Sequence, residues 1–193
     1  MPRIAEHSVD PLFIQRWSSR AMSGEALSSA ELSSLFEAAR WAPSTANSQP
    51  WRFVYALAGT PEFQTFFELL LEGNRAWCHR AGALVCVVSK STIGNGQPWR
   101  MHAFDTGAAW MSMALQGSLM GLVVHGMAGF DYSAARERLH VPEAFKVQCM
   151  VAVGKPGPRE DLPEPLRARE QPNDRHPISQ FTFAGRMPDE TVP

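Results

Sequence analysis

The sequence predicts one globular domain over residues 1–193 that combines helices with strands. A chain of 193 residues is near the size of one typical domain, roughly 150 residues, and too short for two independent ones. With 45% hydrophobic and 19% charged residues, it has the balance of a protein with a large core, which excludes a disordered chain. Segments with helical spacing of apolar residues alternate with segments that have strand spacing.

The first predicted helix begins after Ser28. Ser28 and Glu31 match the Ser-x-x-Glu pattern of a capping box, and Pro43 ends the helical pattern. The apolar positions between them have helical spacing: Leu32, Leu35, Phe36 and Ala39. We therefore expect an amphipathic helix here.

Three segments have the patterns of strands. Residues 51–57 place an aromatic or aliphatic side chain at every second position, which is typical of a half-buried strand. Residues 83–88 form a continuous apolar run, which suits a central strand covered on both faces. Residues 145–153 are predicted to form a third strand.

Two more helices are predicted between these strands. Thr60 caps the first with its hydroxyl, Pro61 occupies the first helical position, and Gly73 closes the helix. Its buried face carries Phe63, Phe66, Phe67, Leu70 and Leu71. The second is a short helix over residues 131–140 that Pro142 stops.

Residues 102–121 are apolar almost all round and have the length of a long helix. Such a helix needs burial on every side, which a small monomer does not readily provide. We therefore expect a partner subunit to cover part of it, as in a homodimer.

After Gly154 the composition changes. Frequent prolines prevent any long regular element, so residues 154–193 are predicted to form an extended C-terminal arm. The arm carries four apolar side chains that do not suit a free tail: Ile178, Phe181, Phe183 and Met187. We expect it to wrap over its own subunit or a neighbour.

Charge and cysteine content exclude several classes of protein. Lysine and arginine total 18 against 19 acidic residues, so neither nucleic acid nor an anionic membrane is an expected partner. No segment has the pattern of a signal peptide or the length of a membrane span. Three cysteines without a Cys-x-x-Cys pair are expected to be reduced and buried in a cytoplasmic protein: Cys78, Cys86 and Cys149.

Several familiar sites are missing from the sequence. The chain has no complete dinucleotide fingerprint, no Walker motif, no Gly-x-Ser-x-Gly and no His-Glu-x-x-His. Its six histidines are scattered, so no metal site is predicted.

Two segments carry side chains suited to a ligand. Residues 16–20, Arg-Trp-Ser-Ser-Arg, offer two guanidinium groups and a hydroxyl, which match a phosphate dianion. The alternative is a solvated helix edge. The loop at residues 42–51 offers Pro, Ser, Thr, Asn and Gln beside two tryptophans, which suits a planar polar molecule. The alternative there is an ordinary helix-to-strand connection.

Taken together, the motifs closely resemble those of the flavin-dependent nitroreductase family. Arg-x-Ser-x-Arg at residues 16–20 is followed by E-A-A-R-W-A-P-S-T-A-N-S-Q-P-W-R-F at residues 37–53. Further matches follow in the same order over nearly the whole chain: Gly73-Asn74, Gly121-Leu122, Gly126 to Asp131, Val153 to Pro156, and Arg175 to Ile178.

The resemblance implies an α+β, nitroreductase-like fold in which helices flank a mostly antiparallel central sheet. It also implies an intertwined homodimer in which the C-terminal arm takes part. Two FMN molecules would bind at the subunit interface.

The resemblance also implies which residues contact FMN. Arg16, Ser18 and Arg175 would hold the phosphate, and Trp17 would contribute from its backbone. Arg20 matches a basic position near flavin N1 and O2, where reduction places negative charge.

Other contacts are implied at the ring system. Asn74 matches a contact to the pyrimidine ring, and Ala128 and Gly129 would present backbone amides near N5. Three contacts would come from the partner chain: Pro43, Ser44 and Asn47. Trp77 departs from the family, because other members have a lysine there, so a less cationic flavin site is expected.

The implied function is hydride transfer from NADH or NADPH, through FMN, to a planar electrophile such as a nitroaromatic, quinone or enone. One flavin face would serve both substrates in a ping-pong reaction. Because FMN carries the chemistry, no side chain is expected to be a catalytic acid or base. Two alternatives stay open: a non-catalytic module that senses or stores FMN, and a relative that uses FMN without a nicotinamide.

Overall fold

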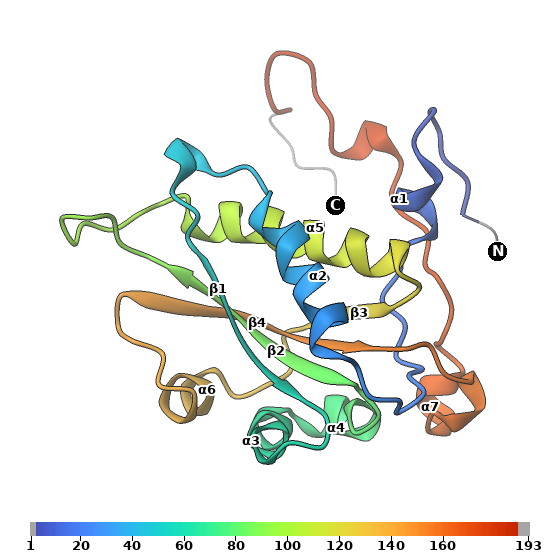
Figure 1. The fold of residues 1–193 in the computed structure, drawn as a ribbon. Coiled ribbons are helices and arrows are strands. Elements are labelled where there is room, and N and C mark those ends of the chain that lie inside the picture. The colour runs from blue at the N-terminus through green and yellow to red at the C-terminus, as the bar shows by residue number, and fades with distance from the viewer. Residues whose placement is uncertain (1–2, 189–193) are drawn as a thin grey trace.

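A computed structural model of the protein describes residues 3–188 (Figure 1). Its strands are β1 (Trp51–Leu57), β2 (Ala83–Lys90), β3 (Val123–Met127) and β4 (Phe145–Gly154). Its α-helices are α1 (Pro11–Gln15), α2 (Ser29–Arg40), α3 (Pro61–Leu69), α4 (Glu72–Cys78), α5 (His102–Leu119), α6 (Tyr132–Arg138) and α7 (Glu164–Arg167).

The strands form one sheet in the order β1-β2-β4-β3. Trp51 pairs with Ser89 across β1 and β2, and Ala83 pairs with Val153 across β2 and β4. The register between β2 and β4 shifts once, after Val87. Every strand pairing in the described part of the chain is antiparallel, so the predicted α+β fold is confirmed.

Helices cover both faces of the sheet (Figure 1). α2 and α5 pack on one face, and α3, α4 and α6 pack on the other. Alternate residues of β2 enter opposite cores, with Val85 and Val87 beside α5 and Leu84 and Cys86 beside α3. The prediction of a central strand covered on both faces is therefore confirmed.

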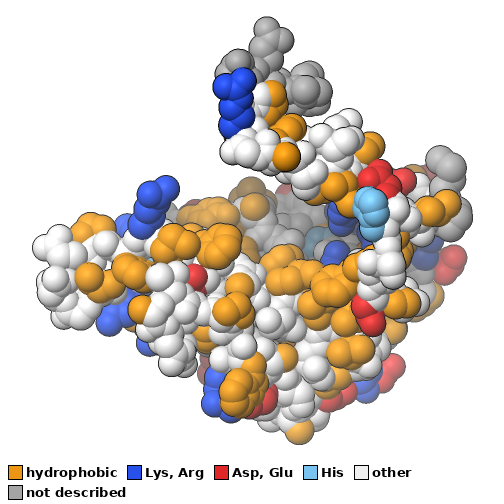
Figure 2. Space-filling model, turned by 90° about the horizontal axis from the view of Figure 1, so that it is seen from above, with side chains coloured by type: hydrophobic (Ala, Val, Ile, Leu, Met, Phe, Trp, Pro, Cys, Tyr) orange, Lys and Arg blue, Asp and Glu red, His pale blue; other side chains and the backbone are white. Residues whose placement is uncertain are grey.

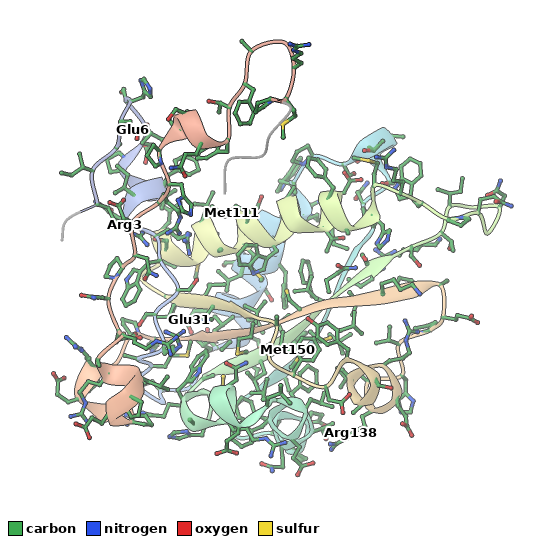
Figure 3. The ribbon with its side chains drawn as sticks, turned by 180° about the vertical axis from the view of Figure 1, so that it is seen from behind. Arg3, Glu6, Glu31, Met111, Arg138 and Met150 are labelled. Atoms are coloured by element: carbon green, nitrogen blue, oxygen red, sulfur yellow. The ribbon has the colours of Figure 1, made fainter. Side chains whose placement is uncertain are left out.

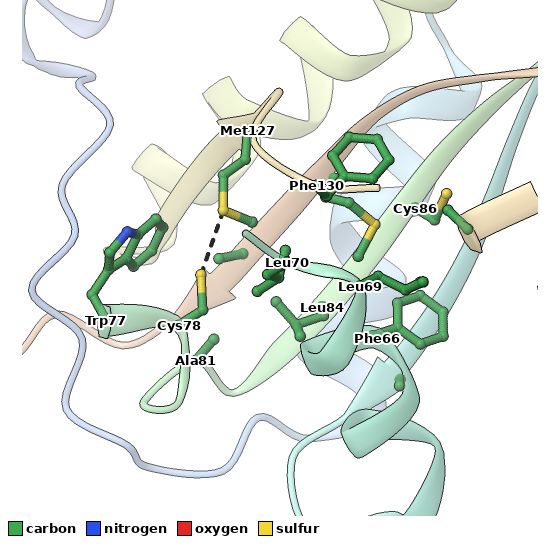
Figure 4. Close-up of a cluster of buried hydrophobic side chains, with 14 of the residues drawn as sticks. Phe66, Leu69, Leu70, Trp77, Cys78, Ala81, Leu84, Cys86, Met127 and Phe130 are labelled. Carbon is green, nitrogen blue, oxygen red and sulfur yellow. Dashed lines mark hydrogen bonds between the residues drawn. The ribbon is translucent and has the colours of Figure 1, made fainter. Parts of the chain in front are cut away.

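Large side chains fill the core beneath α3 and α4 (Figure 4). Phe66 and Leu69 of α3 share this core with Trp77 and Cys78 of α4. The Cys78 sulfur lies 3.4 Å from the sulfur of Met127, the last residue of β3. This contact packs α4 against β3, the strand at one edge of the sheet.

The cysteines are free thiols within residues 3–188. Burial raises the pKa of Cys86 to about 12 and that of Cys149 to about 11. Burial also raises the pKa of Cys78. All three stay protonated at neutral pH and act as small apolar side chains. Cys78 and Cys86 are buried, as the sequence predicts, whereas Cys149 is only partly buried.

The capping box at the start of α2 is present. The Ser28 hydroxyl accepts a hydrogen bond from the Glu31 amide at 3.1 Å, and the Glu31 carboxylate accepts one from the Ser28 amide at 2.8 Å. The face turned toward the sheet buries Leu32, Leu35 and Ala39. The helix ends at Arg40, before Pro43, in agreement with the sequence.

The single helix predicted over residues 60–73 is wrong. The structure has two helices, α3 and α4, separated by two extended residues, Leu70 and Leu71, and Gly73 lies inside α4 instead of closing a helix. Leu70 forms an isolated antiparallel bridge with Phe130. The bridge gives this backbone partners far away in the sequence, which compete with helical hydrogen bonds.

Two side chains of this segment also differ from expectation. Thr60 occupies the N-cap position, but its hydroxyl donates to the Leu57 carbonyl at 2.9 Å instead of accepting from the helix. Leu71 is 56% exposed, although helical spacing places it on the buried face. The break at Leu70 is the reason, because it ends the helical spacing on which that placement depends.

α5 has one buried face and one exposed apolar face. Ala109, Met113 and Gly117 are buried on the side of the sheet. Phe104 is 74% exposed and Leu119 is 67% exposed, and hydrophobic side chains are spread over the face that carries α2 and α5 (Figure 2). Such an exposed apolar face is typical of an interface. Within residues 3–188, no helix combines the length and hydropathy that a membrane span requires.

Residues 155–188 form the predicted arm, with only short helical turns. The arm returns to the N-terminal segment, where Arg3 Nε donates to the Asn173 carbonyl at 2.7 Å and Glu6 accepts from the Ile178 amide at 3.1 Å (Figure 3). The arm therefore packs against its own chain as far as Ile178. Further along, Phe181, Phe183 and Met187 are exposed, and residues 189–193 lie outside the described part.

Gly117→Ala tests the packing of α5 on β3. A Cβ at Gly117 would lie 2.3 Å from Cγ2 of Val124. Alanine favours a helix by about 1 kcal/mol over glycine, but overpacking costs about 1–3 kcal/mol. We expect a net loss in the free energy of unfolding, measured by urea denaturation. Gly73→Ala is the control, because its Cβ would meet nothing within 4 Å and stability should stay equal or rise. A Gly117→Ala protein as stable as this control contradicts the packing.

Candidate functional site

A basic recess of about 240 Å³ lies beside β3, where the two ends of the chain meet. Its lining residues are Arg3, Arg16, Trp17, Ser18, Arg20, His125, Arg169, Gln171, Asn173 and Arg175. Five of these described residues are arginines and none is acidic. The recess is therefore strongly cationic.

Arg16 has an incomplete set of partners. Among the described residues nothing accepts a hydrogen bond from its buried Nη1 atom. Burial, and then the charges of Arg3 and Arg175, lower the pKa of its guanidinium group. Since an unpaired buried charge is costly, the recess suits an anion that brings several acceptor oxygens. A phosphate monoester has this chemistry.

The structure brings five of the predicted site residues together in this recess: Arg16, Trp17, Ser18, Arg20 and Arg175. They come from residues 16–20 and from the arm, so the recess exists only when both segments are in place. Pockets that enclose a whole drug-sized ligand measure about 300–1,000 Å³. The recess therefore accommodates the phosphate end of a ligand such as FMN, and the remainder would lie outside it.

Arg3 links the two segments. Its Nη1 donates to the carbonyls of Ile14 at 2.7 Å and Arg16 at 2.9 Å, while its Nε bonds to the arm at Asn173. Burial, and then the charge of Arg175, lower the pKa of Arg3. Sequence reasoning missed this residue, since it stands alone outside any motif.

His125 of β3 was also missed. Its Nδ1 lies 2.9 Å from the Ser19 carbonyl oxygen, so Nδ1 carries the hydrogen and donates it. Burial is the largest cause that lowers the pKa of His125, and the charge of Arg20 lowers it further. The imidazole is therefore neutral at pH 7.

Trp77 packs behind His125, with ring centroids 4.7 Å apart. The indole is 1% exposed and does not line the recess. Neither Trp77 nor the neutral His125 supplies a positive charge to this side of the recess.

Two other predicted residues meet at the far end of β3. Asn74 Nδ2 donates to the Gly129 carbonyl at 2.9 Å, and a Cβ on Gly129 would lie 2.8 Å from that nitrogen. Only glycine permits this approach. Ala128 precedes Gly129 and lies about 10 Å along the strand direction from His125, at about 3.3 Å per residue. The Asn74–Gly129 contact thus lies beyond the recess, further along the direction of β3.

The loop between α2 and β1 has a strained backbone. Three non-glycine residues have positive φ: Ala46 at 52°, Asn47 at 53° and Gln49 at 44°. The buried Asp105 accepts from the Thr45 amide at 3.1 Å, and the Ser44 hydroxyl accepts from the Gln49 amide at 3.0 Å. Strain of this kind persists where surrounding contacts fix it, and it is concentrated at functional sites. Asp105 has no motif, so sequence reasoning did not find it.

The three residues expected to come from the partner chain also lie outside the recess: Pro43, Ser44 and Asn47. Their loop binds α5 at Asp105, whereas Arg16 lines a small cavity with Ser118 near the other end of α5. At 1.5 Å per residue, these positions on α5 are about 20 Å apart. One chain alone does not bring the loop to the recess.

Two larger recesses do not gather the predicted residues. One, of about 470 Å³, lies between the N-terminal segment and the arm. The other, of about 790 Å³, is near the start of α5 and is lined by Arg100, Glu143 and Lys146 among others. Size alone would favour these recesses, but the unpartnered Arg16 and the five arginines favour the smaller one.

Comparisons with known proteins agree with this picture. A crystal structure described as an oxidoreductase containing FMN is 41% identical, covers 97% of each chain and has a TM-score of 0.94. An uncharacterized 15.4 kDa protein of Mycolicibacterium smegmatis is 31% identical over 130 residues, which cover 67% of this chain and 86% of the relative. An Archaeoglobus fulgidus protein, provisionally named NADH dehydrogenase/NAD(P)H nitroreductase, is 27% identical over 158 residues, covering 77% and 86%.

The similarity extends beyond individual relatives. Residues 14–155 match the model of the nitroreductase family. This match includes the Arg-x-Ser-x-Arg segment, the strained loop and the whole sheet. Because it spans well over half of the sequence, the chain belongs to the nitroreductase family.

Proposed function

We propose that the protein is an FMN-dependent oxidoreductase that transfers hydride from NADH or NADPH to a planar electrophile such as a nitroaromatic, quinone or enone. The observation that carries this proposal is the unpartnered, buried Nη1 of Arg16 in a recess without carboxylates. An FMN phosphate supplies the charge and acceptor oxygens that this recess needs. The whole chain, residues 1–193, forms one domain in this proposal, because the N-terminal segment and the C-terminal arm build the recess together.

In this proposal Arg16, Ser18 and Arg175 hold the phosphate, and Trp17 contributes a backbone group. These residues line one recess, and the Nη1 atom of Arg16 is already buried there. A guanidinium group suits the task because its fork of donors matches phosphate oxygens.

The ring system of FMN would extend along β3 toward Asn74. Bound FMN supplies the hydride-transfer chemistry. Arg20 would lie by N1 and O2, where its fixed positive charge favours electron uptake. Ala128 and Gly129 would direct backbone amides at N5, and the hydrogen bond from Asn74 to Gly129 keeps that backbone in place.

We further propose that Pro43, Ser44 and Asn47 reach the flavin of a second subunit. A twofold axis across α5 would bring the start of one α5 beside the end of the other. The loop of one subunit would then lie near the recess of its partner, although the two are about 20 Å apart along α5 of one chain. The exposed apolar face of α5 supports such a homodimer, since Phe104 and Leu119 would then be covered.

The names of relatives support FMN as the cofactor and a nicotinamide as the hydride donor. A protein 41% identical contains FMN, and the Archaeoglobus fulgidus relative carries an NAD(P)H nitroreductase name. With no separate nicotinamide motif in the sequence, the donor would stack on FMN and leave before the acceptor enters. Ping-pong kinetics follow from that order.

The first test is the flavin content and its reduction. We expect the purified protein to contain FMN, identified by chromatography after acid release, and NADH or NADPH to bleach it without air. Steady oxidation of the donor in the presence of a quinone should follow. FMN that stays oxidised with both donors would favour a flavin-storing module or a nicotinamide-independent enzyme. Protein with no affinity for FMN would refute the proposal.

Arg16→Ala should weaken FMN binding without unfolding the protein. The change removes a charged donor to the phosphate, worth about 1.5–3 kcal/mol, or roughly 10- to 150-fold in dissociation constant. Fluorescence titration with FMN measures this. Arg138→Gln is the matched control, because Arg138 pairs with Glu68 at 2.7 Å on the surface. Equal affinity of both variants would remove Arg16 from the phosphate site.

Mixed dimers test the contribution of the second subunit. Arg16→Ala and Asn47→Ala chains, co-expressed with different tags, should form a mixed dimer with one intact site and one doubly altered site. We expect tight FMN binding at about half the sites, from the symmetry of a twofold dimer. Homodimers of either variant should lack the tight site. A mixed dimer no better than its parents, or a flavin-loaded monomer in sedimentation, contradicts the shared site.

A further inference from the structure

Glu170 is a buried carboxylate to which the proposed reaction assigns no task. Its residue is 6% exposed, and it stands in the arm between Arg169 and Gln171, which line the basic recess. Placing a carboxylate out of contact with water is unfavourable unless it is hydrogen-bonded and paired. Its position therefore needs an explanation.

One oxygen of Glu170 holds the segment that carries the predicted phosphate and flavin ligands. Oε1 accepts from the Ser19 hydroxyl at 2.6 Å, the Arg20 amide at 2.7 Å and the Ala21 amide at 3.0 Å. These three bonds join residues about 150 positions apart in the sequence. They fix the backbone from which the Arg20 side chain extends.

The other oxygen acts through its charge. Oε2 lies 3.8 Å from Arg20 Nη1, and within residues 3–188 it has no hydrogen-bond partner. The side chain of Glu170 is 3% exposed and that of Arg20 is 25% exposed, so water screens this pair only in part. The carboxylate thus reduces the positive potential that Arg20 presents to a neighbour.

We infer that Glu170 is a positioning residue of the flavin site: its Oε1 fixes residues 19–21, and its charge offsets that of Arg20 and lowers the midpoint potential of bound FMN. The inference rests on the proposed function, in which Arg20 lies beside flavin N1 and O2. Reduction adds negative charge there, so a nearby carboxylate disfavours the reduced flavin.

Two substitutions separate the two actions. Glu170→Gln keeps an oxygen that can accept the three hydrogen bonds but removes the charge. Glu170→Ala removes both. Asp161→Asn is the matched control, because Asp161 belongs to the same C-terminal segment and pairs with Arg80 at 2.7 Å, outside the recess.

The flavin readouts are the dissociation constant of FMN and the midpoint potential of the bound flavin. Glu170→Gln should bind FMN at least as tightly as the unaltered protein, and its potential should be more positive. Glu170→Ala should bind FMN at least about tenfold more weakly, because its loss leaves three donors without their acceptor. Asp161→Asn should change neither quantity. An unchanged potential in flavin-loaded Glu170→Gln overturns the charge effect and leaves only a structural latch.

Hydrogen exchange tests the positioning without flavin. In the unaltered protein and in Glu170→Gln, the amides of Arg20 and Ala21 should exchange slowly, and in Glu170→Ala they should exchange faster. Equal protection in all three proteins overturns the positioning role. Failure of the unaltered protein to bind FMN would instead refute the proposed function, and the exchange result would still decide whether Glu170 holds the segment.

Discussion

The hydrogen bonds from residues 19–21 to Glu170 hold the N-terminal segment and the C-terminal arm together. The basic recess depends on this contact, because both segments line it. Five arginines line the recess, and burial, followed by the charges of Arg3 and Arg175, lowers the pKa of Arg16. Such repulsion would separate the segments if nothing opposed it. Glu170 and the backbone bonds of Arg3 supply the opposing interactions. The site is thus assembled from segments that lie about 150 positions apart in the sequence.

The sheet supplies the rigid part of the same site. β3 pairs with β4 over its whole length, and α5 packs against both. This support fixes His125 in the middle of β3, and the backbone of Gly129 follows just beyond the end of the strand. The strained loop near Asp105 is held just as firmly, but at the far end of α5. In the proposed dimer, a single chain therefore supplies parts of two separate sites, with the exposed apolar face of α5 between them.

Local features of the sequence predicted the fold well, and long-range contacts account for the errors. The capping box of Ser28 and Glu31 and the apolar run of β2 depend on near neighbours, so their patterns are visible. The break at Leu70 depends on a bridge to Phe130, sixty residues away, which no local pattern reveals. The site divides in the same way. Arg16 and Asn47 stand in motifs, whereas Arg3, Asp105 and Glu170 gain their positions only when distant segments meet.

The unpartnered arginine also links ligand binding to stability. An anion in the recess would accept from Arg16 Nη1 and reduce the repulsion among Arg3, Arg16 and Arg175, and these interactions exist only in the folded chain. A ligand that binds only the folded state stabilises it by mass action. That gain acts on residues 16–21 and on the arm, because they build the recess. Binding of the phosphate end would therefore stabilise the segment that carries Arg20, so that the phosphate contacts support the residue whose charge acts on the flavin ring.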